Sequence, residues 1–380
     1  MHHPICYYIP SHMLAHINVA RARGLAEPGP AQQSAKVSEA FRQRRQQAAL
    51  ASLTPTPPSS GPTRVPPSSG GRSHSVTTTK GSSALAPAVA PVGLTIPAPG
   101  THARLIYDDQ NQWAFDVLDV RNEDDPAVAG QNVNLAYDAL GATLEFYRDV
   151  LGRDSIDNLG INLDANVNYG VSFDNAFWDG TRMVFGNGDN AIFQDFTSDV
   201  DVPGHELTHG VTQHTAGLLY SDQPGALNEA TSDIFGACID ARVNHQDAGS
   251  FNWLIGEGVM APQLYGEAIR SMAYPGTAYD DPILGADPQP ATMAGYVPGG
   301  DPHVNSGIIN RWFYLMATDL GMDEAAKIWY ATLQSLWPTA QFADAAHVAA
   351  AQARILARDG KVPSRAPQTV RGTARAQGII

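Results

Sequence analysis

The segment His205-Glu206-Leu207-Thr208-His209 decides how the rest of the sequence is interpreted. In an α-helix, residues four positions apart lie above one another on the same face, so His205 and His209 can share one metal ion. Glu206 lies beside that face, where its carboxylate can accept a proton from a water molecule held there. The alternative is a surface helix with two exposed histidines. The pattern favours a helix that binds a metal ion.

Two histidines do not hold zinc tightly, so a third protein ligand must come from elsewhere in the chain. Residues 225–233 (GALNEATSD) predict a second helix with Glu229 and Asp233 on one face. Glu229 is the predicted ligand, and Asp233 and Asn228 are predicted to support the ligand histidines by accepting their N–H groups. The alternative is a solvated acidic helix. The apolar residues within 234–239 favour a buried helix, in which carboxylates need partners.

These motifs, together with Tyr220 between them, resemble the thermolysin-like family of zinc endopeptidases. The twenty residues from His209 to Glu229 match the spacing of that family, and the third-histidine pattern of metzincins is absent. Further matches extend over most of residues 104–380. The resemblance implies an α+β fold of two lobes, the first rich in strands and the second helical, with the active site in the cleft between them.

The resemblance also implies a role for each matched residue. One catalytic zinc ion would be held by His205, His209 and Glu229. Glu206 would act as general base, and Tyr220 and His303 would stabilise the oxyanion of the tetrahedral intermediate. Arg270 would contact a substrate carbonyl. Taken alone, Tyr220 is equally a core tyrosine and His303 a loop histidine, and the order of the motifs favours the functional interpretation.

One departure from the family pattern concerns the surroundings of His303. The family usually has an aspartate five positions before this histidine, and the present sequence has Pro298 there. Asp301 is the alternative residue to orient the imidazole, although Pro302 restricts the turn between them.

The positions that bind substrate follow from the same resemblance. Residues 175–178 and 183–186 resemble the edge strand along which the substrate backbone pairs, with Asn175 and Ala176 as contacts. The positions that match the wall of the S1′ pocket, which receives the residue after the cut bond, are all apolar: Phe193, Phe196, Val202, Ile255, Val259 and Ile269. They predict cleavage before Leu, Ile, Val or Phe, and the bulk of Phe196 favours aliphatic residues over aromatic ones.

A structural calcium ion is the second metal that the resemblance implies. Asp201, Asp240 and Glu257 fall on calcium-ligand positions of the family. Asn252 stands where an aspartate is usual, and Asp240 where a longer glutamate is usual, so we expect one site in place of two adjacent ions. The alternative is a cluster of solvated surface acids.

Composition narrows the classes of function. The chain has 380 residues, 43% of them hydrophobic, and a net charge of −14, which argues against nucleic acid or an anionic membrane as the partner. We find no apolar run long enough to span a membrane. Cys6 and Cys238 allow at most one disulfide and exclude a metal cluster held by four cysteines. We expect a soluble monomer that acts on proteins or peptides.

Charge and composition also divide the chain. Residues 1–100 carry a net charge of +7 and residues 101–380 carry −21. Residues 51–103 are rich in Pro, Ser, Thr and Gly, which predicts a disordered linker. The predicted parts are a pro-segment (1–50), this linker (51–103), a strand-rich catalytic lobe (104–200) and a helical catalytic lobe (201–380).

The first residues contain a further resemblance. Residues 6–14 (CYYIPSHML) resemble the opening of the short pro-segment in the protealysin-like branch of the family, although Ser11 follows the first proline and the linker is much longer here. The resemblance implies that the pro-segment inhibits the enzyme in its own chain until the linker is cut. Cys6 then either reaches the zinc ion as a thiolate or remains a reduced thiol.

The first 16 residues lack the pattern of a Sec signal peptide. We therefore expect a secreted or otherwise released protease without that signal, or a cytoplasmic precursor.

The complete prediction is a neutral zinc endopeptidase, made as a latent precursor, that cleaves before bulky hydrophobic residues. The alternatives are a binding module without turnover and a protease directed at one specific partner. Residues 38–50 predict a short basic helix with Ser38 as its cap. Further helices are predicted over residues 132–151, 202–215, 226–243, 306–320, 323–336 and 340–356. Strands are predicted over 104–107, 113–117, 167–173 and 181–185.

Overall fold

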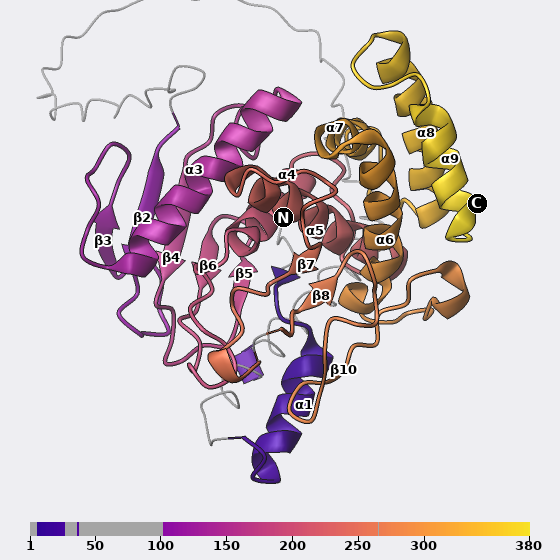
Figure 1. Ribbon diagram of the computed structural model, residues 1–380. Coiled ribbons are helices and arrows are strands. Elements are labelled where there is room, and N and C mark those ends of the chain that lie inside the picture. Colours follow the sequence, from indigo (N-terminus) through magenta and orange to yellow (C-terminus); the bar gives the residue numbers. More distant parts are fainter. Residues whose placement is uncertain (1–5, 27–35, 38–101, 265) are drawn as a thin grey trace, which may run out of the picture.

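The computed structural model describes residues 6–26, 36–37, 102–264 and 266–380 (Figure 1). The helix predicted over residues 38–50 and nearly all of the predicted linker lie outside these ranges. In the described part, a strand-rich lobe precedes a helical lobe, which confirms the α+β fold predicted from the sequence.

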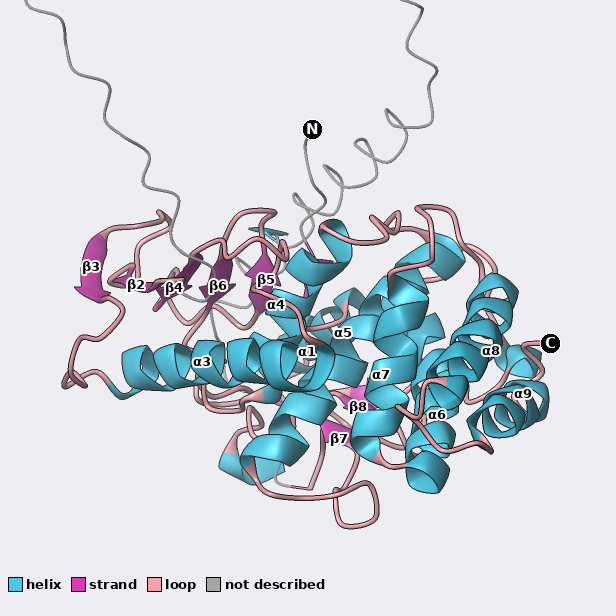
Figure 2. Ribbon diagram, turned by 90° about the horizontal axis from the view of Figure 1, so that it is seen from above, coloured by secondary structure: helices cyan, strands magenta, loops and turns pink. Residues whose placement is uncertain are grey.

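The first lobe is built on a six-stranded sheet with the order β1-β5-β6-β4-β2-β3. Its strands are β1 (Cys6–Tyr7), β2 (Arg104–Asp108), β3 (Leu118–Arg121), β4 (Leu163–Val167), β5 (Ala176–Trp178) and β6 (Met183–Phe185). The central strands β2, β4 and β6 pair in parallel, and β1, β5 and β3 pair antiparallel at the two sides. The long helix α3 (Gln131–Leu151) lies along one face of this row of strands (Figure 2).

Two of the strand predictions are wrong. Residues 113–117 form bends, and of the strand predicted over 167–173 only Val167 lies in a strand, at the end of β4. Positive φ angles at Asp116, Asn168 and Ser172 bend the chain away from an extended path. The aromatic residues that suggested strands pack on one another instead: the rings of Phe115 and Tyr169 stack with 5.1 Å between their centroids. The aromatic content therefore reflects a side-chain cluster and not strand pairing.

The second lobe is helical. Its helices are α4 (Asp201–Gln213), α5 (Asp222–Val243), α6 (Pro302–Leu320), α7 (Met322–Leu333), α8 (Phe342–Arg358) and α9 (Ala366–Ala376). Helix α5 lies in the middle, in contact with α4, α6, α7 and α8, and almost all of its residues are buried (Figure 1). The helices predicted within residues 132–356 are confirmed with shifted ends, while α9 was not predicted.

Short segments connect α5 to α6. They are β7 (Leu254–Ile255), η1 (Pro262–Leu264), β8 (Arg270–Ser271), β9 (Asp280–Asp281), β10 (Gly285–Ala286) and η2 (Met293–Gly295). Strand β7 pairs with β8, and β9 pairs with β10, both antiparallel.

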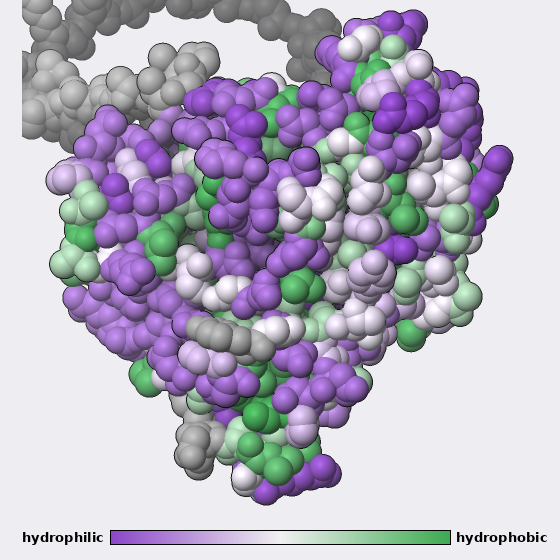
Figure 3. Space-filling view, viewed as in Figure 1, coloured by the Kyte–Doolittle hydropathy of each residue, from purple (hydrophilic) through white to green (hydrophobic). Residues whose placement is uncertain are grey.

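The N-terminal segment (residues 6–26) lies across the boundary between the lobes. Its first residues form β1, which extends the sheet beyond β5, and the chain then enters α1 (Ser11–Ala22) beside β10 (Figure 1). The sequence analysis did not predict α1. Apolar residues gather at the lower edge of the view in Figure 3, where α1 lies, and Val19 and Leu25 are 47% and 53% exposed.

None of the helices in the described part of the chain combines the length and hydropathy of a membrane-spanning segment.

The loop between β4 and β5 depends on one close backbone contact. A Cβ atom at Gly186 would lie 1.9 Å from the carbonyl oxygen of Phe173, far inside van der Waals contact. We predict that Gly186→Ala lowers the free energy of unfolding by about 2 kcal/mol or more, because the two buried backbones must separate. The melting temperature in differential scanning calorimetry measures this loss.

Gly372→Ala is the matched control. Gly372 lies exposed in α9 with nothing near its hypothetical Cβ. Alanine should be neutral or stabilise this helix by about 0.5–1 kcal/mol. Equal melting temperatures for the two variants would contradict the close contact at Gly186.

Candidate active site

The two histidines of the HELTH motif lie on α4, which packs closely against α5. A Cβ atom at Gly236 of α5 would come within 2.9 Å of the Asp201 carbonyl oxygen, so only glycine allows this approach of the helices. His205 and His209 are both buried, and their Nε2 atoms are 3.0 Å apart. The predicted sharing of one face of the helix is therefore present in the structure.

Glu229 reaches the same point from α5. Its Oε2 atom is 3.4 Å from Nε2 of His205, and its Oε1 atom is 3.7 Å from Nε2 of His209. The other ring nitrogen of each histidine is held by α5: Nδ1 of His205 lies 2.9 Å from Asp233 Oδ1, and Nδ1 of His209 lies 2.8 Å from Asn228 Oδ1. The Nε2 atoms therefore face Glu229 and each other.

The donor set fits zinc. Ligand atoms that bind a tetrahedral zinc ion at about 2.0–2.2 Å are roughly 3.3–3.5 Å from one another, close to the separations found here. Electrostatics points the same way, because the buried carboxylates of Asp233 and Glu229 outweigh the effect of burial and raise the pKa of His205 to about 9. Burial lowers the pKa of His209 to about 3. The two rings therefore differ in protonation, and His209 is neutral at pH 7 with its Nε2 directed toward Glu229.

Glu206 lies in the same buried pocket. Burial raises the pKa of its carboxyl group to about 8, against the opposing effect of His205.

Tyr220 and His303 lie together at the side of this pocket. Tyr220 Oη donates to Glu229 Oε1, and it lies 3.5 Å from Nε2 of His303. Nδ1 of His303 lies 2.8 Å from Asp301 Oδ1, and the same oxygen accepts the backbone N–H of His303. Asp301 caps the N-terminus of α6, so Pro302 becomes its first residue and does not prevent the contact. Asp301 thus occupies the orienting position that the sequence suggested for it.

The N-terminal segment occupies the place expected for a substrate backbone. The N–H of Tyr8 donates to the Ala176 carbonyl at 3.0 Å, and the N–H of Ile9 donates to Asn175 Oδ1 at 2.9 Å. Arg270 Nη1 donates to the Tyr8 carbonyl at 3.1 Å. In addition, Nε2 of His303 lies 2.6 Å from the carbonyl oxygen of Tyr7. The predicted substrate contacts are therefore made by residues 7–9 of the chain itself.

Comparison with known proteins places this arrangement in a family. The model of the thermolysin metallopeptidase catalytic domain matches residues 96–213, and the model of the α-helical domain of the same peptidases matches residues 216–369. The chain belongs to the thermolysin metallopeptidase family. It is therefore classed among the metalloendopeptidases, as the resemblance in the sequence implied.

Similar proteins within the thermolysin family come from several bacteria. Protease PrtS of Photorhabdus sp. (strain Az29) is 45% identical over 239 residues, which are 60% of this chain and 64% of that protein. The extracellular metalloprotease of Pectobacterium carotovorum subsp. carotovorum is 45% identical over 241 residues, 62% of this chain and 70% of that protein. The solved precursor of protealysin from Serratia proteamaculans has a TM-score of 0.71 and 42% identity, covering 76% of this chain and 91% of that one.

The six apolar positions assigned to the S1′ wall of this thermolysin-family protein are all buried: Phe193, Phe196, Val202, Ile255, Val259 and Ile269. The side chain of Tyr8 is fully buried, and its ring centroid is 6.5 Å from that of Phe196 and 5.1 Å from that of His205. Sequence analysis did not foresee that an aromatic residue of the chain itself would lie there.

The acidic residues assigned to calcium gather near the start of α4. Asp201 is buried, and burial together with Asp199 and Asp240 raises its pKa well above the usual value. Burial and Asp199 raise the pKa of Asp240 to about 7. Asn252 donates to Glu257 Oε2 at 2.8 Å. Sequence analysis missed Asp199, which no periodic pattern marks because it precedes the helix.

One histidine of the N-terminal segment makes docking of that segment sensitive to pH. His12 Nε2 lies 2.9 Å from Tyr279 Oη, and burial lowers the pKa of His12 to about 4. Among the charged groups that face it, Asp301 raises this pKa, whereas His303, His16 and Arg270 lower it. A released segment would return His12 to a pKa of about 6.5. The released state then binds more protons between these two values, so docking weakens as the pH falls from about 6.5 to about 4.

We predict that at about pH 5 docking is weaker than at neutral pH by a factor on the order of ten. Hydrogen exchange of residues 6–22 measures docking, and His12→Gln should lose this part of the pH dependence because it carries no titrating ring. His16→Gln, a change at an exposed position of α1, is the matched control and should retain it. The same pH profile in all three proteins would contradict the prediction.

Proposed function

We propose that this chain is the latent precursor of a zinc-dependent neutral endopeptidase that cleaves on the N-terminal side of bulky hydrophobic residues. The observation that carries the proposal is the convergence of His205, His209 and Glu229 on one buried point, with Glu206 beside it. The names of the relatives, which include an extracellular metalloprotease, support it.

The residues of the chain have distinct parts in this reaction. When bound, zinc supplies Lewis acidity, which polarises a carbonyl group and makes water more acidic. Glu206 takes the proton of the attacking water and returns it to the leaving nitrogen. His303 and Tyr220 donate hydrogen bonds to the developing oxyanion, and Asp301 holds the His303 ring in place.

The substrate is held by its backbone and by one side chain. Asn175, Ala176 and Arg270 hold the backbone on both sides of the residue after the cut bond, as they hold residues 8 and 9 here. The apolar S1′ wall accepts a bulky side chain by excluding water from it. We therefore propose protein and peptide substrates for this chain.

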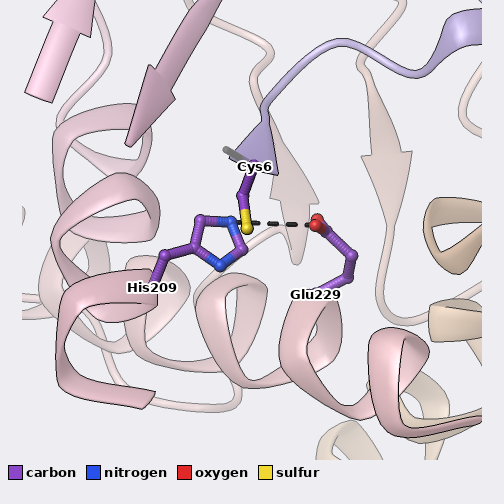
Figure 4. A group of neighbouring side chains, drawn as sticks. All are labelled: Cys6, His209 and Glu229. Carbon is purple, nitrogen blue, oxygen red and sulfur yellow. Dashed lines mark ion pairs between the residues drawn. The ribbon is translucent and has the colours of Figure 1, made fainter. Parts of the chain in front are cut away.

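We propose that the pro-segment, residues 1–50, keeps the precursor inactive. Its residues 7–9 fill the positions of a substrate, and Cys6 points into the metal site between His209 and Glu229 (Figure 4). The Cys6 sulfur and the ligand atoms of these two residues all lie within 4.8 Å of one another. A thiolate is a good zinc ligand, so Cys6 would take the coordination position that catalysis needs for water. Cleavage within residues 51–103 would then release the inhibitor.

Calcium, cellular location and assembly complete the proposal. Asp201, Asp240 and Glu257 offer the carboxylate oxygens that calcium prefers, and a bound cation would relieve the repulsion that raises the pKa values of Asp201 and Asp240.

The name of the Pectobacterium relative supports release from the cell. We propose that the mature enzyme acts as a monomer.

Catalysis is tested with Glu206→Gln. We predict a loss of roughly 10²-fold or more in casein hydrolysis by the processed protein, because glutamine cannot accept the water proton. Zinc content by elemental analysis should be unchanged, and a zinc chelator should abolish the wild-type activity. Glu145→Gln, a change on the exposed face of α3, is the control. Undiminished hydrolysis by Glu206→Gln would contradict the proposed reaction and favour a binding module.

Latency is tested with Cys6→Ser in the full chain. We predict that the intact variant hydrolyses casein roughly tenfold faster than the intact wild-type chain, because a serine hydroxyl is a far weaker zinc ligand than a thiolate. Mass spectrometry confirms that both chains are uncut. Cys238→Ala removes the other thiol, which is buried in α5, and should leave latency unchanged. Equal latency of Cys6→Ser and wild type would contradict the role of Cys6.

A further inference from the structure

We propose that Asp201 is a specificity-determining residue at the base of the S1′ pocket and that it makes the enzyme prefer tyrosine directly after the cut bond. This inference rests on the proposed function and deepens it. It assigns a second role to a residue that the sequence connected only with calcium.

The register of the N-terminal segment identifies Tyr8 as the residue in the S1′ position. The Tyr7 carbonyl faces His303, the group proposed to stabilise the oxyanion. Tyr8 itself donates through its N–H to the Ala176 carbonyl and accepts through its own carbonyl from Arg270. The bond between residues 7 and 8 therefore occupies the position of a cut bond, and the side chain of Tyr8 enters the pocket beyond it.

The pocket accepts the whole tyrosine ring. Tyr8 has no exposed surface, its ring meets His205 edge-on, and the Arg270 guanidinium lies 5.1 Å from its ring centroid. Opposite the ring, a Cβ atom at Gly256 would lie 2.7 Å from Tyr8 Oη, so glycine at this position leaves room for the hydroxyl group. The pocket thus has the depth for a tyrosine, although the sequence suggested that Phe196 narrows it.

A carboxylate lies where the hydroxyl group ends. Tyr8 Oη donates to Asp201 Oδ1 at 3.0 Å, and Asp201 Oδ2 accepts the N–H of Gly256 at 2.7 Å. Asp201 is itself buried, in the first turn of α4. Its hydrogen bond with the Gly256 N–H holds the carboxylate in this orientation. A tyrosine hydroxyl group is protonated at neutral pH and so donates to this carboxylate.

Phenylalanine fills the same space but leaves the buried Oδ1 atom of Asp201 without a donor. A buried acceptor that loses its partner costs more than the bond itself contributed. A site built to hydrogen-bond a hydroxyl group therefore rejects the analogue that lacks it. We expect a Tyr-to-Phe preference of roughly tenfold in kcat/KM.

The test uses three peptides that differ only in the residue after the cut bond: Tyr, Phe or Leu. The full chain is first allowed to process to constant activity. The expected result is a Tyr-to-Phe ratio of roughly ten for the wild type. In Asp201→Ala the ratio should fall toward one, because no side-chain atom remains there to exchange a hydrogen bond with the hydroxyl group. Asp138→Ala, a change on the exposed face of α3, is the control, and it should keep the high ratio.

A second experiment uses the intact chain and needs no Asp201 variant, so a folding defect of that variant does not affect it. Tyr8→Phe removes only the hydroxyl group, and it should raise hydrolysis of the Leu peptide by the uncut chain roughly tenfold. Cleavage of all three peptides with a Tyr-to-Phe ratio of one or less would overturn the role of Asp201 and leave the endopeptidase standing. No cleavage of any peptide would overturn the proposed function, and this inference with it.

Discussion

The buried carboxylate of Asp233 is the interaction on which the site depends. It lies on α5 and accepts hydrogen bonds from Arg270 through both Nε and Nη2, and it contacts Nδ1 of His205. Asn310 of α6 donates to its second oxygen. Burial opposes its ionisation, but Arg270 outweighs this effect and lowers the pKa of Asp233 to about 2. One anion thus fixes a metal-site histidine and the arginine of the substrate cleft, and neither can move independently.

Under the proposed function, the same arrangement explains how one site holds both the pro-segment and substrates. Most polar contacts to residues 7–9 go to backbone atoms, which every peptide offers. The side chain of Tyr8 adds the contact that depends on residue type. Binding strength and selectivity are therefore separated in space, the first along β5 and Arg270 and the second inside the pocket.

The sequence predicted those features that follow from a repeat along one helix. His205, His209, Glu229 and Asp233 were found because a four-residue spacing places side chains on one face. Extended segments were predicted less well: residues 113–117 contain strand-forming aromatic residues, but positive φ angles and ring stacking hold them in turns. The position of Asp201 beneath Tyr8 joins residues 193 apart in the chain, and no local pattern encodes such a contact.

The pairing of β1 with β5 matters for the colloidal behaviour of the processed molecule. If the pro-segment is released as proposed, β5 becomes the outermost strand of its sheet. The open edge of a strand can pair with any extended chain, including one from a neighbouring molecule. Here β5 is three residues long, which leaves little edge for such adhesion. Loss of the first 100 residues would also remove their net charge of +7 and leave residues 101–380 with a net charge of −21. Molecules of the processed enzyme would then repel one another, while the edge of β5 stays open to substrate.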